Sequence, residues 1–241
     1  MIRRQKRMRF LGGFYAFPGG KVDPDDGASE ILGRCHGVTR ASAERLVPPE
    51  GRLPALAFWV AAARELLEET GVLTACDGSG RPVVEADPGA AGRIEVLRAA
   101  HMAKRASFCE LLATEGWHLD LGPFRYLSHF ITPPSSPIRF TARFFLAPVP
   151  PGQSPRLFDE EASEGFWVEP AEGFRRHRSG EWAMAEPADC GLRYLAQFDD
   201  LEGVWAAHED GRHKFHGILD RVEAVGVKIR RGVDGRTPAA P

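Results

Sequence analysis

The chain has 241 residues, and its 43% hydrophobic and 27% charged content is ordinary for a globular protein. A net charge of −2 gives no reason to expect nucleic acid or an anionic membrane as partner, and no apolar run approaches the roughly 18 residues of a membrane span. The four cysteines are widely spaced and form no CxxC pair, which argues against a zinc cage or a redox pair. We therefore expect a cytoplasmic protein.

The first half of the chain predicts one short strand and one strong helix. Residues 1–9 are too charged for a buried strand, whereas the aromatic segment 10–20 predicts a short strand bracketed by glycine pairs. Residues 24–56 are rich in Pro, Gly, Asp and Arg, which predicts a surface excursion with one short helix near 41–47. The strong helix covers 55–71, because Ala, Leu and Glu favour it and a glycine stands at its end.

The second half mixes strands and helices without a regular alternation. Aromatic and apolar alternation predicts strands at 71–76, 124–134 and 138–150. Helical spacing predicts one or two helices over 93–116 and further helices over 190–198 and 201–209, and residues 165–182 predict a strand turning into a helix. The tail 235–241 is expected to be disordered. This mixture predicts an α+β protein or a helix–sheet–helix sandwich.

Three glutamates crowd one face of the strong helix. Glu65, Glu68 and Glu69 have i, i+3 and i+4 spacing, so their carboxylates lie together and repel each other unless a cation sits between them. A hard divalent ion such as Mg²⁺ takes oxygen ligands of this kind. Gly19 and Gly20 would let the backbone approach a ligand or metal. For the helix alone, an acidic solvated face beside a glycine turn explains the pattern equally well.

The glycine segment and the glutamate segment together resemble a Nudix box, G-x5-E-x7-R-E-U-x-E-E-x-G-U with U aliphatic. Gly20 matches the first glycine of the pattern, and Asp26 stands where the pattern has glutamate. Residues 64–72, RELLEETGV, match the second half without exception. Residues 27–63 replace the seven residues of the spacer and so contain an insertion of 30. We expect the two halves of this split box to meet in space.

A split box resembles one branch of the family, the peroxisomal coenzyme A diphosphatases of animals and their bacterial relatives. The segments RMRFLGGFYAFPGGKVD and FITPPSSPIRFTARFFL are similar to that branch as well. The resemblance implies a Nudix-type α/β/α sandwich with a mixed central sheet, whose N-terminal strand is shortened or missing here. It places the Nudix domain at 1–205, with 27–57 as the insertion within the box, and a C-terminal extension with a partly disordered tail at 206–241.

The resemblance also implies a metal site and a mechanism. Mg²⁺ or Mn²⁺ would be held by three carboxylates and one main-chain carbonyl, those of Glu65, Glu68, Glu69 and Gly19. Arg64 would orient a glutamate, and Asp26 would support the site with a shorter side chain than the family's glutamate. Water would attack the diphosphate, with Glu68 or Glu69 as the general base.

A further acidic residue is expected from a distant loop. In many Nudix enzymes it precedes a strand tryptophan, and Glu161 lies six residues before Trp167. Glu160 and Glu164 are rivals for this role, and a solvated loop carboxylate is the simpler alternative.

Three residues are candidates for contact with the substrate. Gly20 lies in the box, and Arg139 and Arg143 are four apart on one strand and therefore share a face. The two arginines could hold phosphate groups or could equally be solvated.

The expected activity is hydrolysis of a nucleoside diphosphate linked to another moiety. CoA or acyl-CoA leads, followed by ADP-ribose, NADH and nucleotide sugars. The rival is a non-catalytic Nudix-fold ligand-binding module, although such modules usually lose box glutamates that this chain keeps. We expect a small-molecule nucleotide diphosphate as partner, no nucleic acid and no membrane, with a homodimer left open.

Overall fold

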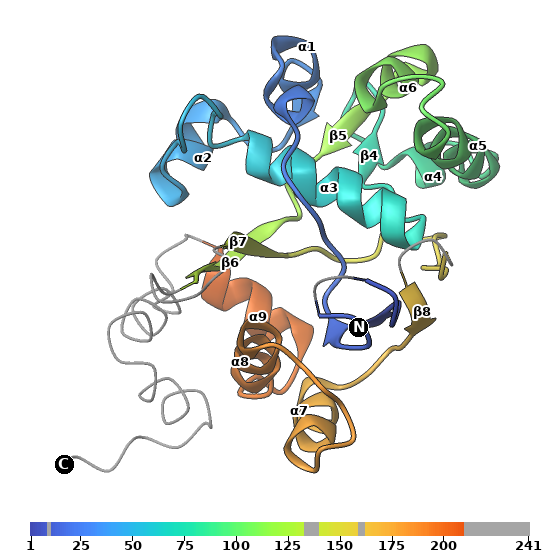
Figure 1. The fold of residues 1–241 in the computed structure, drawn as a ribbon. Helices are drawn as coiled ribbons and strands as arrows, with labels where there is room; N and C mark the ends of the chain where they lie inside the picture. Colours follow the sequence, from blue (N-terminus) through green and yellow to red (C-terminus); the bar gives the residue numbers. More distant parts are fainter. Residues whose placement is uncertain (9–10, 133–139, 159–161, 210–241) are drawn as a thin grey trace. The chain divides into compact units, whose positions relative to one another are not determined.

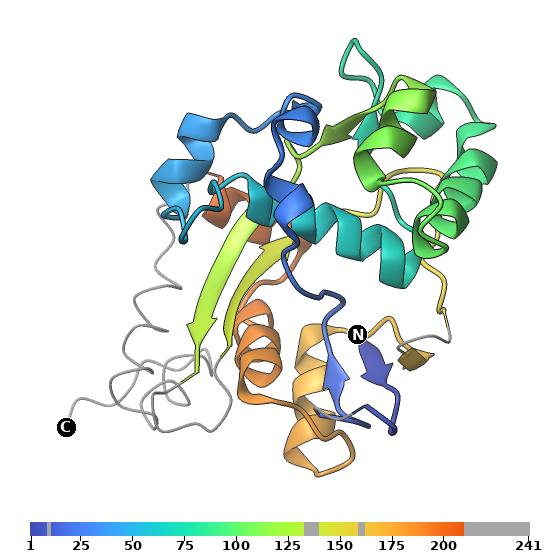
Figure 2. The ribbon, with the colours of Figure 1, turned by 45° about the horizontal axis from the view of Figure 1, so that its top comes forward.

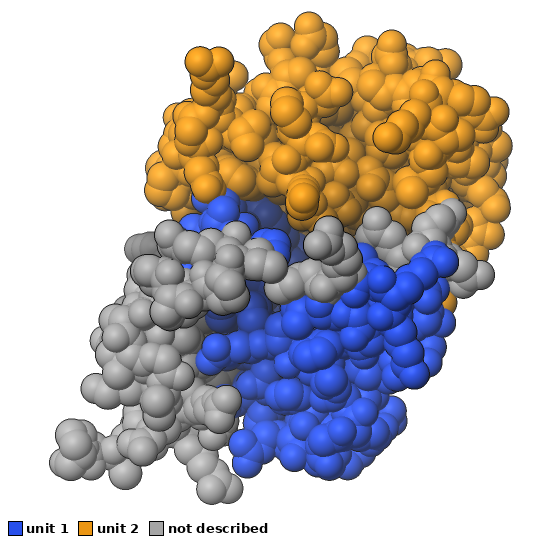
Figure 3. All heavy atoms as spheres, viewed as in Figure 1, with its two compact units in different colours: residues 1–17, 125–146, 161–241 blue, residues 18–124, 147–160 orange. Residues whose placement is uncertain are grey.

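The computed structural model describes residues 1–8, 11–132, 140–158 and 162–209. Its strands and helices form two compact units, distinguished by colour in Figure 3. The first unit comprises Met1–Phe17, Arg125–Leu146 and Glu161–Pro241, and the second comprises Pro18–Phe124 and Ala147–Glu160. None of the described helices is long and apolar enough to cross a membrane. The predicted α/β class is confirmed, whereas the predicted domain boundaries stay predictions.

The second unit contains a mixed three-stranded sheet in the order β3 (Cys35–His36), β5 (His118–Asp120), β4 (Ala75–Cys76). β3 runs parallel to β5, and β4 runs antiparallel to it. The first of these strands comes from the segment within the split box. That segment therefore takes part in the sheet.

Buried side chains show the same for the rest of this segment. It begins with a 3₁₀ turn, η1 (Pro24–Gly27), and adds α1 (Ser29–Leu32) and α2 (Arg40–Leu46). Ile31, Ala43 and Val47 are 2%, 0% and 1% exposed. The predicted helix near 41–47 is confirmed, but a pure surface excursion is wrong, because these apolar side chains are removed from water.

The strong helix is α3 (Ala57–Thr70), as predicted. Its buried side includes Trp59, Ala63 and Leu67 at the i, i+4 spacing of one helix face. The helix ends at Gly71, which has φ +73° and donates its N–H to the carbonyl of Leu67 at 2.9 Å. Glycine enters this left-handed conformation without a steric penalty, so the sequence sets the end of the helix.

Residues 93–116 form two helices, α5 (Ala90–Met102) and α6 (Phe108–Glu115), after the short α4 (Val83–Ala86). A capping box starts α6, because Ser107 and Glu110 each accept a hydrogen bond from the other's main-chain N–H. α5 lies beside the C-terminal half of α3 in both Figure 1 and Figure 2. This packing brings side chains of α5 to the glutamate helix.

The segment after residue 146 also belongs to the second unit. The side-chain amide of Gln153 accepts from the Leu73 N–H at 2.9 Å and donates to the Leu73 carbonyl at 2.8 Å, in the manner of a neighbouring strand. The Arg156 N–H donates to the Thr70 carbonyl at 2.8 Å. The segment is therefore tied to the chain that leaves α3.

The first unit contains a three-stranded antiparallel sheet in the order β2 (Tyr15–Ala16), β1 (Ile2–Arg4), β8 (Ala162–Gly165). Residues 2–4 thus form the central strand, although their charge argued against one. The charge of Arg3 is offset in this strand, because its guanidinium pairs with Glu164 at 2.7 Å and lies over the Tyr15 ring at 5.5 Å. The N-terminal strand is short but not missing.

An antiparallel hairpin of β6 (Arg125–Ile131) and β7 (Thr141–Leu146) confirms two further predicted strands. The helices of this unit are α7 (Pro170–Arg178), α8 (Glu186–Leu195) and α9 (Leu201–His208). The strand expected at the start of 165–182 lies earlier, in β8. The predicted loop between the hairpin strands and the tail lie outside the described residues.

α8 joins two apolar clusters of the first unit. Cys190 and Tyr194 pack with Leu127 of the hairpin, and Ala188 and Leu192 pack with an aromatic group around Trp182. Each pair has i, i+4 spacing, so two neighbouring faces of one helix are buried.

Candidate functional site

The two halves of the split box meet at an ion pair between Arg64 and Asp26. The guanidinium donates from Nε to Asp26 Oδ1 at 2.9 Å and from Nη2 to Oδ2 at 3.0 Å. It also donates to the Lys21 carbonyl at 2.7 Å. Arg64 and Asp26 are 5% and 2% exposed. The expectation that the halves meet in space is confirmed, and the short side chain of Asp26 does reach its partner.

Arg64 also holds two of the three helix glutamates. Its Nη1 donates to Glu65 Oε1 at 2.9 Å and to Glu68 Oε1 at 2.8 Å. Burial alone would lower the pKa of Arg64, but the hydrogen bonds and charge of its carboxylate partners, Asp26 first, raise it above the ordinary value. A permanent cation therefore offsets the repulsion between neighbouring carboxylates.

The glycine segment contacts the acidic face of the same helix. The Gly19 N–H donates to Glu69 Oε2 at 2.8 Å. A Cβ at Gly20 would clash with the carboxylate oxygens of Glu65, so a side chain cannot be placed there without displacing that glutamate. The sequence pairs these glycines with these glutamates because the backbone must approach the carboxylates closely.

Glu68 has a second partner that the sequence did not reveal. His101 of α5 places Nε2 2.8 Å from Glu68 Oε1. Burial opposes ionisation of Glu68, but the hydrogen bonds from His101 and Arg64 outweigh it and hold the pKa of that carboxyl below its usual value. No local pattern identifies His101, because the contact depends on how α5 packs against α3.

The donor set fits a hard divalent cation by its chemistry. Glu65, Glu68 and Glu69 offer carboxylate oxygens, and no Cβ obstructs the approach at Gly20. Among the described residues, however, no three His, Cys, Asp or Glu side chains are grouped so that they could hold a metal ion. Binding would therefore require at least one of the carboxylates to move.

The remaining predicted residues are not brought to this cluster by the described contacts. Arg139, Glu161 and its rival Glu160 lie outside the described residues. Arg143 lies in β7 of the first unit, and Glu164, paired with Arg3, lies in β8 of that unit. The role of the loop carboxylate rests on the resemblance, and that of the two arginines rests on their spacing in the sequence.

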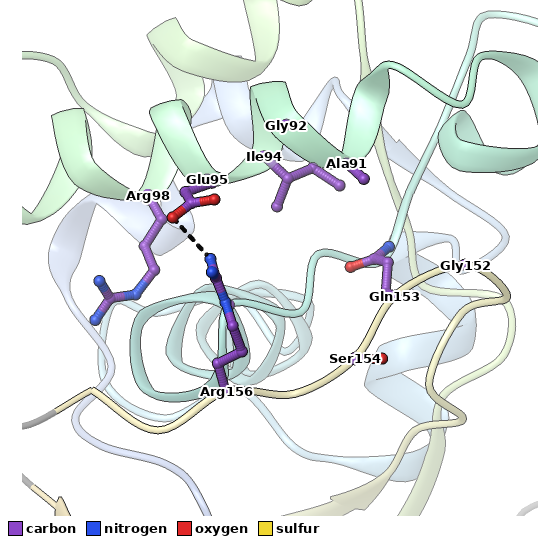
Figure 4. Close-up of a pocket in the computed structure, with 10 residues that line it drawn as sticks. Ala91, Gly92, Ile94, Glu95, Arg98, Gly152, Gln153, Ser154 and Arg156 are labelled. Atoms are coloured by element: carbon purple, nitrogen blue, oxygen red, sulfur yellow. Dashed lines mark ion pairs between the residues drawn. The ribbon is translucent and has the colours of Figure 1, made fainter.

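An open pocket of about 330 Å³ lies between α5 and the segment 152–156 in the second unit (Figure 4). Its charged side chains and its glutamine are engaged with the protein itself. Arg156 pairs with Glu95 at 3.0 Å, and the Gln153 amide bonds the Leu73 backbone. We assign no ligand to this pocket.

The sequence and the structure of this chain are similar to those of known Nudix proteins. A solved NUDIX hydrolase from Alicyclobacillus acidocaldarius is 33% identical, with a TM-score of 0.64 over 85% of this chain and 86% of that chain. No family model matches. A Caenorhabditis elegans protein named nudix hydrolase 7 is 28% identical over 202 residues. The acyl-coenzyme A diphosphatase NUDT19 of Gallus gallus is 27% identical over 237 residues. Each alignment covers 84% of this chain, which spans 57% and 62% of these two curated relatives.

Proposed function

Because the chain belongs to the Nudix hydrolase superfamily, we propose that it is a metal-dependent hydrolase of nucleoside diphosphates linked to another moiety. The observation that carries this proposal is that Glu65 and Glu68 share Arg64, which the buried Asp26 holds, while Glu69 on the same helix accepts from the Gly19 N–H. A rival, non-catalytic module would have little reason to keep three acidic side chains so close together.

The proposed site holds Mg²⁺ or Mn²⁺ through carboxylate and carbonyl oxygens, those of Glu65, Glu68, Glu69 and Gly19. When bound, such an ion neutralises charge on a diphosphate and eases removal of a proton from the attacking water. Glu68 or Glu69 takes that proton. Arg64 keeps the carboxylates in place, and Asp26 keeps Arg64 in place. Glu161 is the proposed acidic residue of the distant loop.

CoA or acyl-CoA is the leading substrate in this proposal. One relative is named an acyl-coenzyme A diphosphatase. The split box of this chain also resembles the coenzyme A diphosphatase branch of the family. Gly20, Arg139 and Arg143 are the proposed substrate contacts. ADP-ribose, NADH and nucleotide sugars are the alternative substrates. The cytoplasmic location, the absence of a nucleic-acid or membrane partner and a homodimer stay predictions.

A substrate panel tests the proposal. Purified protein is incubated with CoA, acyl-CoA, ADP-ribose, NADH and a nucleotide sugar, with Mg²⁺, with Mn²⁺ and with EDTA. We expect turnover of at least one compound with metal and none with EDTA, and two phosphate-bearing products by mass spectrometry. Binding of a compound without turnover under every metal condition would favour the non-catalytic module instead.

A further inference from the structure

Two side chains of α5, a helix outside the box, contact one residue within it. The Nε of Arg98 donates to the main-chain carbonyl of Glu68 at 2.7 Å. His101, three residues further along α5, places Nε2 2.8 Å from Glu68 Oε1. Glu68 is therefore held both by its backbone and by its side chain.

Arg98 supplies a hydrogen-bond donor and a positive charge at the C-terminal end of α3. Glu68 lies in the last turn of that helix, where carbonyl groups lack partners within the helix and the helix dipole favours a nearby cation. Arg98 is 6% exposed, and its guanidinium lies 3.1 Å from the centre of the Phe158 ring. The main chain of Glu68 is thus fixed by a buried side chain from another helix.

The contact from His101 controls which carboxylate oxygen of Glu68 is engaged. Oε1 accepts from both His101 and Arg64, whereas no described residue donates to Oε2. A carboxylate can only accept here, so the proton of this hydrogen bond sits on Nε2 of His101. The ring packs near Phe108, with 5.8 Å between ring centres, and Nδ1 is buried without a hydrogen-bond partner in the described residues.

Arg64 and His101 hold Glu68 Oε1 in different ways. Arg64 Nη1 donates to both Glu65 and Glu68, and the other nitrogens of its guanidinium contact Asp26, so Arg64 is shared among three carboxylates. His101 contacts Glu68 from a different helix and does not depend on Glu65.

We propose that His101 is a positioning residue for the metal site, which holds Oε1 of Glu68 and leaves Oε2 as the oxygen that binds the ion. This inference rests on the proposed function, since it assigns a partner to one of the proposed ligands. Partners of this kind that orient a metal ligand commonly change metal affinity 10- to 100-fold when they are removed.

Two amide substitutions at position 101 separate positioning from packing. The amide of a glutamine can reach the place of Nε2, whereas the shorter asparagine places its amide near Nδ1 and cannot reach Glu68. The probe is Mn²⁺ alone, titrated into the substrate-free full chain and followed by calorimetry and by the electron paramagnetic resonance signal of free Mn²⁺. Val96→Ala, on the same helix at a site 67% exposed, is the control.

We expect His101→Asn and His101→Ala to weaken Mn²⁺ binding by about 10- to 100-fold. His101→Gln and Val96→Ala should stay near the wild-type affinity, and the melting temperatures of the Asn and Gln variants in EDTA should agree. Equal Mn²⁺ affinity of the Asn and Gln variants, with wild-type protein that binds Mn²⁺ and hydrolyses substrate, would overturn the role of His101 alone. Wild-type protein that binds no Mn²⁺ would overturn the proposed function itself, and this inference with it.

Discussion

Arg64 and Asp26, which are 38 positions apart, form a buried two-point ion pair with distances of 2.9 and 3.0 Å. The pair joins the two halves of the split box across the inserted segment. Because Arg64 also contacts Glu65 and Glu68, this one contact ties the glycine segment to the carboxylates proposed to bind the metal.

Asp26→Asn should lower both stability and activity. The variant loses the negative charge opposite Arg64, while Glu65 and Glu68 remain as counter-charges, so we expect a loss of about 1.5–3 kcal/mol in the free energy of unfolding. Urea denaturation measures it. The control is Asp25→Asn, an exposed neighbour, expected within about 0.5 kcal/mol of wild type. Equal stability of the two variants would show that the ion pair contributes nothing.

Glu69→Gln should reduce the turnover rate at least about 100-fold, because it removes a proposed metal ligand or the general base. The amide oxygen can still accept from the Gly19 N–H, so the melting temperature in EDTA should not fall. The exposed Glu44→Gln serves as the matched control. A Glu69→Gln variant with the wild-type rate would rule out the metal-site reading.

Ile31→Ala tests whether the inserted segment belongs to the core. Ile31 is 2% exposed, and truncation of a buried Ile commonly costs about 2–5 kcal/mol. Chemical denaturation measures the loss, with the 67% exposed Val96→Ala as the reference for an apolar truncation at the surface.

Replacing residues 28–56 by a short linker extends the same test. A surface excursion, which the composition predicted, would leave folding intact because loop-closure entropy changes little with length. The structure predicts the opposite, because the deletion removes β3 and five buried apolar side chains, those of Ile31, Ala43, Val47, Ala55 and Leu56. A folded deletion variant with an undiminished melting temperature would show that the segment is not part of the core.

Comparison of CoA with dephospho-CoA tests the leading substrate. CoA carries a 3′-phosphate that an arginine can recognise, and loss of one charge-assisted contact at about 1.5–3 kcal/mol predicts a roughly 10- to 100-fold lower kcat/KM for dephospho-CoA. Mass spectrometry should show 3′,5′-ADP and 4′-phosphopantetheine from CoA. Equal turnover of both compounds, or a preference for ADP-ribose, would show that CoA is not the preferred substrate.

His208 predicts acid sensitivity of the first unit. Its Nε2 lies 3.1 Å from the Tyr194 hydroxyl. Burial lowers the pKa of His208 below the ordinary 6.5. The hydrogen bond to the Val204 carbonyl raises this pKa, and the charge of Arg125 lowers it further. A lowered pKa means that the unfolded chain binds the proton more readily. The free energy of unfolding is therefore unaffected by His208 above about pH 6.5, and it falls as the pH drops from there toward the pKa of His208 in the folded protein.

Melting curves at about pH 7.5 and about pH 5.5 measure this effect. His208→Asn should show a smaller fall in melting temperature between the two pH values than wild type, because one titrating group is gone. The exposed Val96→Ala, which removes no titrating group, should keep the wild-type dependence. Identical pH dependence in all three proteins would contradict the assignment to His208.

The residues 64–72 by themselves determined the helix and its acidic face. Helix propensity, the i, i+3 and i+4 spacing of the glutamates and the glycine at the helix end act over a single stretch of chain, so no distant residue is needed to predict them. The same locality explains why the capped helix α6 and the alternating strands β6 and β7 were predicted.

Tertiary structure alone decided which distant residues meet those glutamates. Neither the reach of Asp26 nor the contact of His101 with Glu68 follows from spacing, because each depends on how a segment 38 or 33 positions away packs against α3. The central place of the charged strand β1 likewise needed Glu164, 161 positions from Arg3. Polar composition predicted solvent exposure for both β1 and the inserted segment. In β1 the ion pair with Glu164 satisfies the charge of Arg3. In the inserted segment the apolar side chains of Ile31, Ala43 and Val47 are buried.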